Sequence, residues 1–204
     1  WESSGEDTYQ ISNIPKEQRG TTITIYLNED NKEFSEHMRV KFLLQKYSQY
    51  INFPLILNPE EGDPEVINDS DAIWLKSKRS VKEQEYKDFY KFISYDANDP
   101  LTWMHNKVEG KQEYTSLLFI PEKSPYDLWN RDTPRGIKLF IQRVFIMDDA
   151  AHFLPLYLRF VKGVVDSSDL PLNVSREILQ DHPLVDLIKK GLTKRVIDAL
   201  KKMQ

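Results

Sequence analysis

The sequence predicts an α/β fold in which the larger part of the chain forms an αβα sandwich around a mixed sheet. Two long apolar runs, at residues 114–120 and 137–146, predict strands buried on both faces. Helical spacing of apolar residues comes before the first run, at 80–93, and again at the end of the chain, after Pro183. Strands that alternate with helices indicate a sheet covered on both sides.

The composition describes a soluble, acidic chain and excludes several function classes. The 204 residues are 40% hydrophobic and 29% charged, with a formal net charge of −4 and no cysteine. This charge argues against a strongly basic nucleic-acid interface, and the absence of cysteine excludes disulfides and thiolate metal sites. The four histidines are scattered, so we expect no metal site. No apolar run approaches the roughly 20 residues of a membrane span, and we expect no membrane partner.

The first part of the chain, residues 1–58, reads as strand, strand, helix and strand. Apolar residues alternate with polar ones at 21–27, which predicts a strand with one buried face that pairs with another at 9–14. Apolar residues then recur at helical spacing from Ser35, and a short apolar strand is expected at 53–57. Such a sheet needs further strands, so we expect this part to be the end of a domain.

Residues 59–72 are acidic, contain Pro59, Gly62 and Pro64, and show no periodicity, which predicts a linker. Residues 73–204 are then expected to form a second domain. Its elements include a helix with an aromatic stripe at 80–93, a helix starting near Asp148, and a strand at 160–165. The last helix carries a long apolar stripe: Leu184, Leu187, Ile188, Leu192, Val196, Leu200 and Met203. That pattern stops without a cap, so we expect a truncated helix.

A polar loop at 167–180 leads into another expected helix. Asn173 and Ser175 are both suitable N-cap residues, and Arg176 falls in the first turn. A cation there faces the positive end of the helix dipole, although Glu177 offsets part of the cost. Arginine beside free N–H groups is well suited to binding phosphate. An ordinary surface ion pair with Glu177 or Asp169 is the alternative that spacing leaves open.

The same stretch, Asp166-Ser-Ser-Asp-Leu-Pro-Leu-Asn-Val-Ser-Arg-Glu-Ile-Leu-Gln180, resembles the signature of the heat shock protein 90 chaperone family, in particular its bacterial type. The resemblance extends along nearly the whole chain, through Trp1-Glu-Ser3, Arg19-Gly-Thr21, Asp99-Pro-Leu101, Val108-Glu-Gly-Lys111 and Arg143-Val-Phe-Ile-Met-Asp148. It implies that residues 1–58 are the C-terminal part of the nucleotide-binding domain. Residues 73–204 would be the large subdomain of the middle domain.

The resemblance implies a heat-shock (stress-response) chaperone that hydrolyses ATP, with Mg, in its N-terminal domain. The seven glycines of this chain are isolated, so no phosphate-binding loop can be assembled here. We therefore expect the chain alone to bind no ATP and to be inactive as an enzyme. The middle domain would contribute Arg176, which reaches the γ-phosphate, and Gln180, one helical turn later.

The resemblance also implies docking of the loop on the N-terminal ATP-binding domain through Phe145, Leu170, Leu172 and Asn173. Ordinary core packing is the alternative for the three apolar residues. Client proteins are the expected partners in the cytoplasm, with homodimerisation through a C-terminal domain absent from this chain. Three aromatic residues near turns could be client contacts or core: Trp103, Tyr126 and Trp129. The alternative function is a pure protein–protein interaction module in which the loop at 167–180 is structural.

Overall fold

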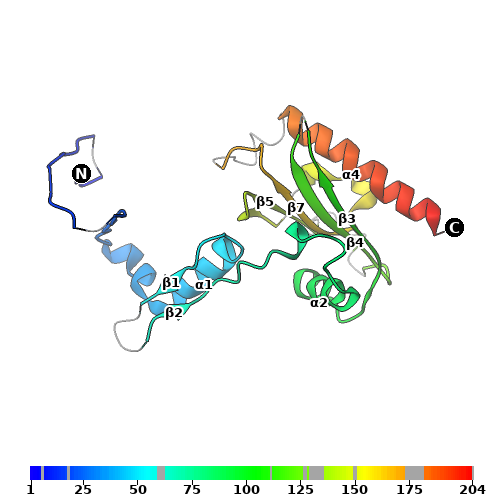
Figure 1. Ribbon diagram of the computed structural model, residues 1–204, viewed down its shortest axis with the longest axis horizontal. Coiled ribbons are helices and arrows are strands. Elements are labelled where there is room, and N and C mark those ends of the chain that lie inside the picture. Colours follow the sequence, from blue (N-terminus) through cyan, green and yellow to red (C-terminus); the bar gives the residue numbers. More distant parts are fainter. Residues whose placement is uncertain are drawn as a thin grey trace. The chain divides into compact units, whose positions relative to one another are not determined.

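The computed structural model describes residues 1–5, 7–17, 19–58, 63–110, 112–125, 128, 136–148, 151–172 and 182–203. The chain divides into two compact units, Trp1–Glu36 and His37–Gln204. Most helices and strands belong to the second unit (Figure 1). The domain division expected at residues 59–72 stays a prediction.

The first unit lacks the two expected strands in its described part. Residues 9–14 and 21–27 are extended without strand pairing, and the regular element is a 3-10 helix, η1 (Glu29–Ser35). One isolated bridge joins Glu2 and Gln10. Of the side chains expected to face a core at 21–27, Ile23 and Ile25 are more than 70% exposed and Leu27 is 37% exposed. A strand needs a hydrogen-bonded neighbour and a covered face, and the alternating pattern alone supplies neither.

The second unit contains a small sheet, a large sheet and the elements around them. In chain order these are α1 (His37–Ser48), β1 (Ile56–Leu57), β2 (Glu65–Val66), η2 (Ile73–Leu75), α2 (Glu83–Ser94), β3 (Pro100–Val108), β4 (Tyr114–Pro121), β5 (Ile137–Ile141), β6 (Val144–Met147), η3 (Ala151–Phe153), η4 (Leu156–Leu158), β7 (Lys162–Ser167) and α4 (Pro183–Lys202).

The large sheet has the order β3-β4-β7-β5-β6 and is mixed, as expected. β5 and β7 run parallel, and the other neighbours run antiparallel. β7 approaches β4 closely at Gly163, where an added Cβ would lie 2.2 Å from the carbonyl oxygen of Leu117. Gly163 also has φ +149°, which a side chain would disfavour, so both observations require glycine.

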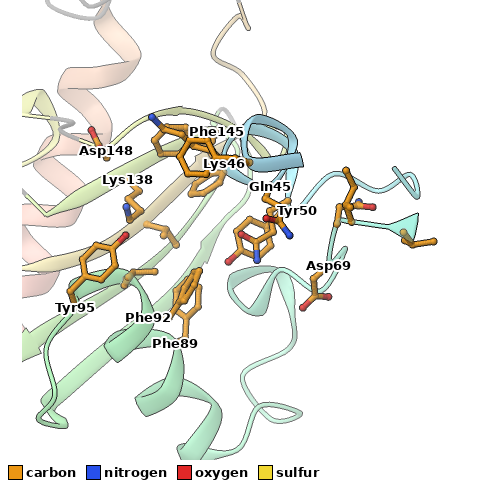
Figure 2. Close-up of a pocket in the computed structure, with 18 residues that line it drawn as sticks. Gln45, Lys46, Tyr50, Asp69, Phe89, Phe92, Tyr95, Lys138, Phe145 and Asp148 are labelled. Atoms are coloured by element: carbon orange, nitrogen blue, oxygen red, sulfur yellow. The ribbon is translucent and has the colours of Figure 1, made fainter. Parts of the chain in front are cut away.

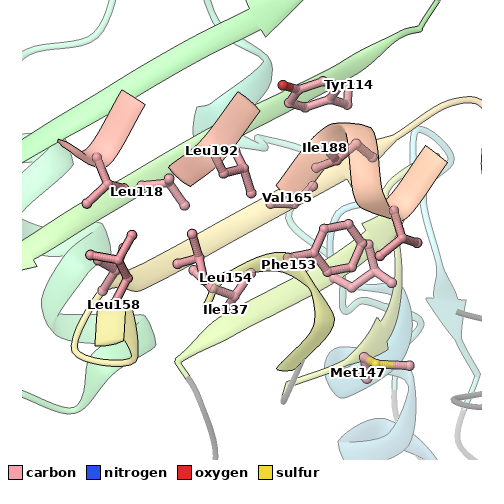
Figure 3. Packing of buried hydrophobic residues seen from close by; sticks show 14 of the residues in the cluster. Tyr114, Leu118, Ile137, Met147, Phe153, Leu154, Leu158, Val165, Ile188 and Leu192 are labelled. Atoms are coloured by element: carbon pink, nitrogen blue, oxygen red, sulfur yellow. The ribbon is translucent and has the colours of Figure 1, made fainter. Parts of the chain in front are cut away.

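One face of the sheet is covered by α4 together with the η3–η4 segment (Figure 3). Leu118 of β4 and Val165 of β7 point to this face, where they pack with Phe153 and Leu192. The core is built from sixteen buried residues, namely Tyr114, Leu118, Ile137, Leu139, Ile141, Met147, Phe153, Leu154, Leu158, Val161, Val165, Leu170, Val185, Ile188, Leu192 and Val196. The predicted stripe of the last helix is confirmed in part: Leu187 and Met203 are exposed, and Val185, which was not expected, is buried.

The other face is covered by α2 and η2, and its core is mostly aromatic. Leu117 and Phe119, whose side chains alternate with that of Leu118, contact this second core. Trp74 is fully buried there, with its ring 4.8 Å from that of Phe140. Cores on both faces confirm the α/β fold and the αβα arrangement.

Two further expected elements differ from the structure. The single strand at 137–146 is a hairpin, because Gln142 and Arg143 adopt φ of 50° and 69° and reverse the chain between β5 and β6. The helix near Asp148 is instead a pair of 3-10 turns in the described residues, which leaves Leu156 and Tyr157 exposed. Pro155 lies between the two turns and has no backbone N–H to donate, so it prevents one continuous helix here.

β3 was not expected, and part of the expected linker is ordered. Pro100 begins the edge strand β3, the position in a sheet where proline is tolerated. Glu65–Val66 pairs with Ile56–Leu57, a shorter strand than the one expected at 53–57. Asn68 then holds the preceding loop, because its amide bonds to Leu55, Ile51 and Phe53. Residues 59–62 lie outside the described part.

A buried chain of hydrogen bonds joins η2, α2 and β3. The Nε2 atom of His105 lies 2.8 Å from the carbonyl oxygen of Trp74, and its Nδ1 lies 2.7 Å from the hydroxyl of Tyr86. A carbonyl can only accept, so Nε2 carries the proton and Nδ1 accepts from Tyr86. Burial lowers the pKa of His105 below its ordinary 6.5, and the charge of Lys78 acts in the same direction.

Leu192→Ala tests the first core. Leu192 is fully buried, so its truncation should lower the free energy of unfolding by about 2–5 kcal/mol. Leu187→Ala, on the same helix at a 48% exposed position, is the matched control and should change it by about 0.5 kcal/mol or less. Urea unfolding followed by circular dichroism measures both; equal effects would contradict this assignment of the core.

His105→Gln tests the buried hydrogen bonds through their pH dependence. Because the pKa of His105 is lower in the folded chain, the unfolded chain takes up the proton first as pH falls. The stability from neutral His105 is present above its unfolded pKa of about 6.5 and is lost as pH falls through the lower folded pKa. The wild-type advantage over the variant in urea unfolding should therefore shrink from pH 7.5 to pH 5. An advantage that is constant with pH would contradict the prediction.

Candidate functional site

The expected site residues divide between described and undescribed parts of the chain. Arg176, Gln180 and Asn173 lie outside the described residues, as do Tyr126 and Trp129. Phe145, Leu170 and Leu172 are described. The geometry of the site is therefore built from the two ends of segment 173–181 and from the elements that hold them.

The end of β7 is tied to the residue before β4. The backbone N–H of Ser168 donates to the carbonyl of Glu113 at 3.1 Å, and the N–H of Glu113 donates to the carboxylate of Asp169 at 2.7 Å. The hydroxyl of Ser167 accepts from the N–H groups of Asp169 and Leu170, both at 3.3 Å. These bonds turn the chain directly after the strand and direct Leu170 into the core.

The β5–β6 turn holds the end of β7 on its other side. The N–H of Gln142 donates to the carbonyl of Ser167 at 3.2 Å, and its side-chain amide lies 3.4 Å from the carbonyl of Ser168. The positive φ values of Gln142 and Arg143 make this turn tight enough to present both donors. The start of the loop is thus fixed between the β5–β6 turn and Glu113.

The residue before the loop, Asp166, is a buried carboxylate. Its side chain accepts from the indole N–H of Trp74 at 2.9 Å and from the backbone N–H of Arg143 at 3.3 Å. Burial raises the pKa of Asp166 above its ordinary 3.8, while these two donors, together with the charge of Arg143, act in the opposite direction. The net shift is upward, so burial is the larger effect.

The three apolar residues expected to dock the loop lie in three different environments. Leu170 is 2% exposed and belongs to the core under α4, whereas Leu172 is 51% exposed. Phe145 lies on the opposite face of the sheet, with its ring 5.6 Å from that of Phe140. The structure therefore does not gather them into one patch, and core packing accounts for Leu170.

Phe145 lines a cavity of about 840 Å³ beside α2 (Figure 2). Phe89 and Phe92 of α2 and Lys138 of β5 lie around the same space. Burial lowers the pKa of Lys138 below its ordinary 10.5. The cavity combines aromatic walls with a cation, but it lies on the face of the sheet away from Leu170.

The far end of segment 173–181 is fixed by the start of α4. Nδ1 of His182 accepts from the N–H of Leu184 at 3.3 Å and caps the helix, and Pro183 occupies its first position. Val185 then enters the same core as Leu170. Both ends of the segment that carries Arg176 are thus anchored in one core.

Trp103 is part of the second core rather than a freely exposed aromatic. It is half-buried, and its ring stacks on that of Tyr86 at 5.2 Å. In the described residues no group of three or more His, Cys, Asp or Glu side chains is placed to hold a metal ion. No helix in that part is both long and apolar enough to cross a membrane.

Sequence reasoning missed Trp74 and Asp166 as residues of the site. The two lie 92 positions apart, so no local spacing connects them. The available signal was a carboxylate directly after the apolar strand residues Val164 and Val165, where a charge needs a buried partner.

Known proteins are similar to this chain along its whole length. Residues 58–204 match the family described as Hsp90 protein. The chain is also 54% identical over 210 aligned residues to Chaperone protein HtpG of Escherichia coli K12, and the figure is the same for that of Shigella boydii serotype 4. The alignments cover 100% of this chain and 34% of each relative, so the chain spans about a third of their length. The chain belongs to the Hsp90 protein family.

Proposed function

We propose that this chain is a segment of an ATP-dependent molecular chaperone and supplies the arginine, Arg176, that contacts the γ-phosphate of ATP. The observation that carries the proposal is the family match over 58–204, which includes Arg176 and the loop before it. The relatives that are 54% identical are named as chaperones. ATP, with Mg, would be held by the N-terminal domain of the full-length protein.

The physical chemistry of phosphoryl transfer suits an arginine delivered from another domain. Negative charge spreads over the phosphoryl oxygens in the transition state, and a guanidinium can pair with two of them. When the arginine arrives with domain closure, it stabilises the closed, reactive state. Gln180, one turn later, would then contact the active site or its water. The anchored residues Leu170 and Val185 on either side support this role, because a positioned charge needs a rigid base.

The chain would also present part of a client-binding surface. Several large apolar side chains are exposed around the α2–β3 connection, namely Phe92, Tyr95 and Leu101. Exposed apolar groups of this kind are typical of surfaces that bind other proteins. The full-length protein would be a cytoplasmic homodimer, joined through a C-terminal domain.

The isolated chain of 204 residues should not bind ATP, because the proposal places the nucleotide pocket outside it. Calorimetric titration with a non-hydrolysable ATP analogue in the presence of Mg should give no dissociation constant below about 1 mM, or about 4 kcal/mol. Tighter binding would show that the chain itself contains a nucleotide pocket.

Arg176→Ala in the full-length protein tests the proposed role directly. Loss of a transition-state charge contact should lower kcat for ATP hydrolysis by more than about tenfold, with a much smaller change in nucleotide affinity. The melting temperature of the isolated chain should stay nearly constant.

The matched control is Arg79→Ala, which removes another arginine, at an exposed position on the turn after η2. It should leave kcat within about twofold of wild type. If Arg176→Ala behaved like this control, or if it destabilised the chain and left the rate unchanged, the loop would be structural. The interaction-module alternative would then hold.

A further inference from the structure

The hydrogen bond between Trp74 and Asp166 joins the start of the αβα unit to the residue from which the loop departs. Trp74 lies in η2 and is fully buried, while Asp166 is the next-to-last residue of β7 and is 6% exposed. The indole N–H and the carboxylate oxygen are 2.9 Å apart. A short, buried and charge-assisted bond of this kind has a defined geometry.

Burial disfavours the charge of a carboxylate at this position. Burial raises the pKa of Asp166, so the ionised form is disfavoured in the folded chain. The sign follows from linkage: a raised folded pKa means that the contribution to stability is largest at low pH and declines as pH rises through the folded value. Burial therefore makes the ionised carboxylate less favourable in the folded chain than in the unfolded chain, and the bonds to Trp74 and Arg143 offset part of this cost.

The carboxylate fixes geometry between two elements. Its other oxygen accepts from the N–H of Arg143 in the β5–β6 turn, and the neighbouring Gln142 donates to the carbonyl of Ser167. Asp166 thus holds β7 to η2 on one side and to the turn on the other. An asparagine cannot replace it in both bonds, because its amide has one acceptor oxygen and its NH₂ group would face a second donor.

Trp74 is itself held firmly enough to act as a reference point. Its carbonyl accepts from His105, and its ring packs edge-on against Tyr50, with the ring centroids 4.6 Å apart. Asp166 therefore bonds to a side chain whose position is determined by the second core. A shift of Asp166 would move Ser167 and the loop start with it.

We propose that Asp166 is a positioning residue for ATP hydrolysis, whose bonds to Trp74 and Arg143 set the direction in which β7 delivers the loop that carries Arg176. The inference rests on the proposed function of Arg176. Asp166 does not contact the nucleotide in this proposal; it acts through the loop.

The experiment compares two matched pairs of substitutions in the full-length protein. Asp166→Asn and Trp74→Phe each disturb the proposed bond. Asp96→Asn and Tyr90→Phe do the same to the bond between the Tyr90 hydroxyl and the Asp96 carboxylate, which is 2.8 Å long. The control bond lies at the C-terminal end of α2, shortly before Pro100, which pairs with Pro121 at one end of β4. Ser167 pairs with Tyr114 at the opposite end of β4.

Both variants at the proposed bond should lower kcat for ATP hydrolysis by about tenfold, since small displacements of a catalytic group cost that much or more, with KM changed by less than about twofold. The double variant Trp74→Phe/Asp166→Asn should be no slower than about the slower single variant, because both disturb one bond. Asp96→Asn and Tyr90→Phe should leave kcat within about twofold of wild type.

Thermal stability separates positioning from a merely structural role. Asp166→Asn should change the melting temperature little, because removal of a buried charge offsets the hydrogen bond that is lost, while Trp74→Phe should lower it, because it removes buried ring volume. A shared loss of kcat with opposite or unequal changes in melting temperature supports the proposal. Rates that follow the melting temperatures across all variants would overturn it, and Trp74→Phe decides alone if Asp166→Asn does not fold.

Arg176→Ala, measured alongside, distinguishes failure of this inference from failure of the proposed function. If Arg176→Ala lowers kcat and the Asp166 and Trp74 variants match the Tyr90 and Asp96 controls, the positioning role is wrong and the role of Arg176 stands. If Arg176→Ala leaves kcat unchanged, the proposed function is wrong, and the positioning role falls with it.

Discussion

The complete burial of β4 is the constraint on which the rest of the large unit depends. Every residue of this strand is buried, and its side chains alternate between a core under α4 and a core under α2. A strand without a solvent-facing side needs an element packed on each face and a hydrogen-bonded neighbour on each edge. β3 and β7 supply the edges. The loop that follows β7 therefore begins from a strand that pairs directly with the buried strand β4.

Sequence patterns predicted the elements whose burial is uniform and failed where the backbone changes direction. The apolar run of β4 and the stripe of α4 are visible because each keeps one period along its length. The hairpin of β5 and β6 is hidden, because Gln142 and Arg143 are not residues that usually signal a tight turn. The strands expected at 9–14 and 21–27 depended on pairing, which periodicity does not test.

The candidate site was predictable from resemblance, while the contacts that hold it were not. Arg176 is identified by the family signature, and no physical feature of its spacing separates a phosphate ligand from a surface ion pair. The bond between Trp74 and Asp166 spans 92 positions and depends on how η2 folds against β7. A buried charge after an apolar strand signals that a partner exists, but it does not say which residue provides it.

Chain length limits how far Arg176 can lie from the end of β7, which is nine positions earlier, at Ser167. Leu172 lies on one side of the undescribed segment and Arg176 is four residues further on, so their Cα atoms are at most about 14 Å apart. On the other side, Pro183 begins α4, and Val185 is fixed in the core. In the proposed role of Asp166, a change in the direction of β7 would shift the point from which this short segment departs. Under this proposal the burial of Asp166 is the cost of fixing that direction. An asparagine has one acceptor oxygen and could not accept from both Trp74 and Arg143 in the same way.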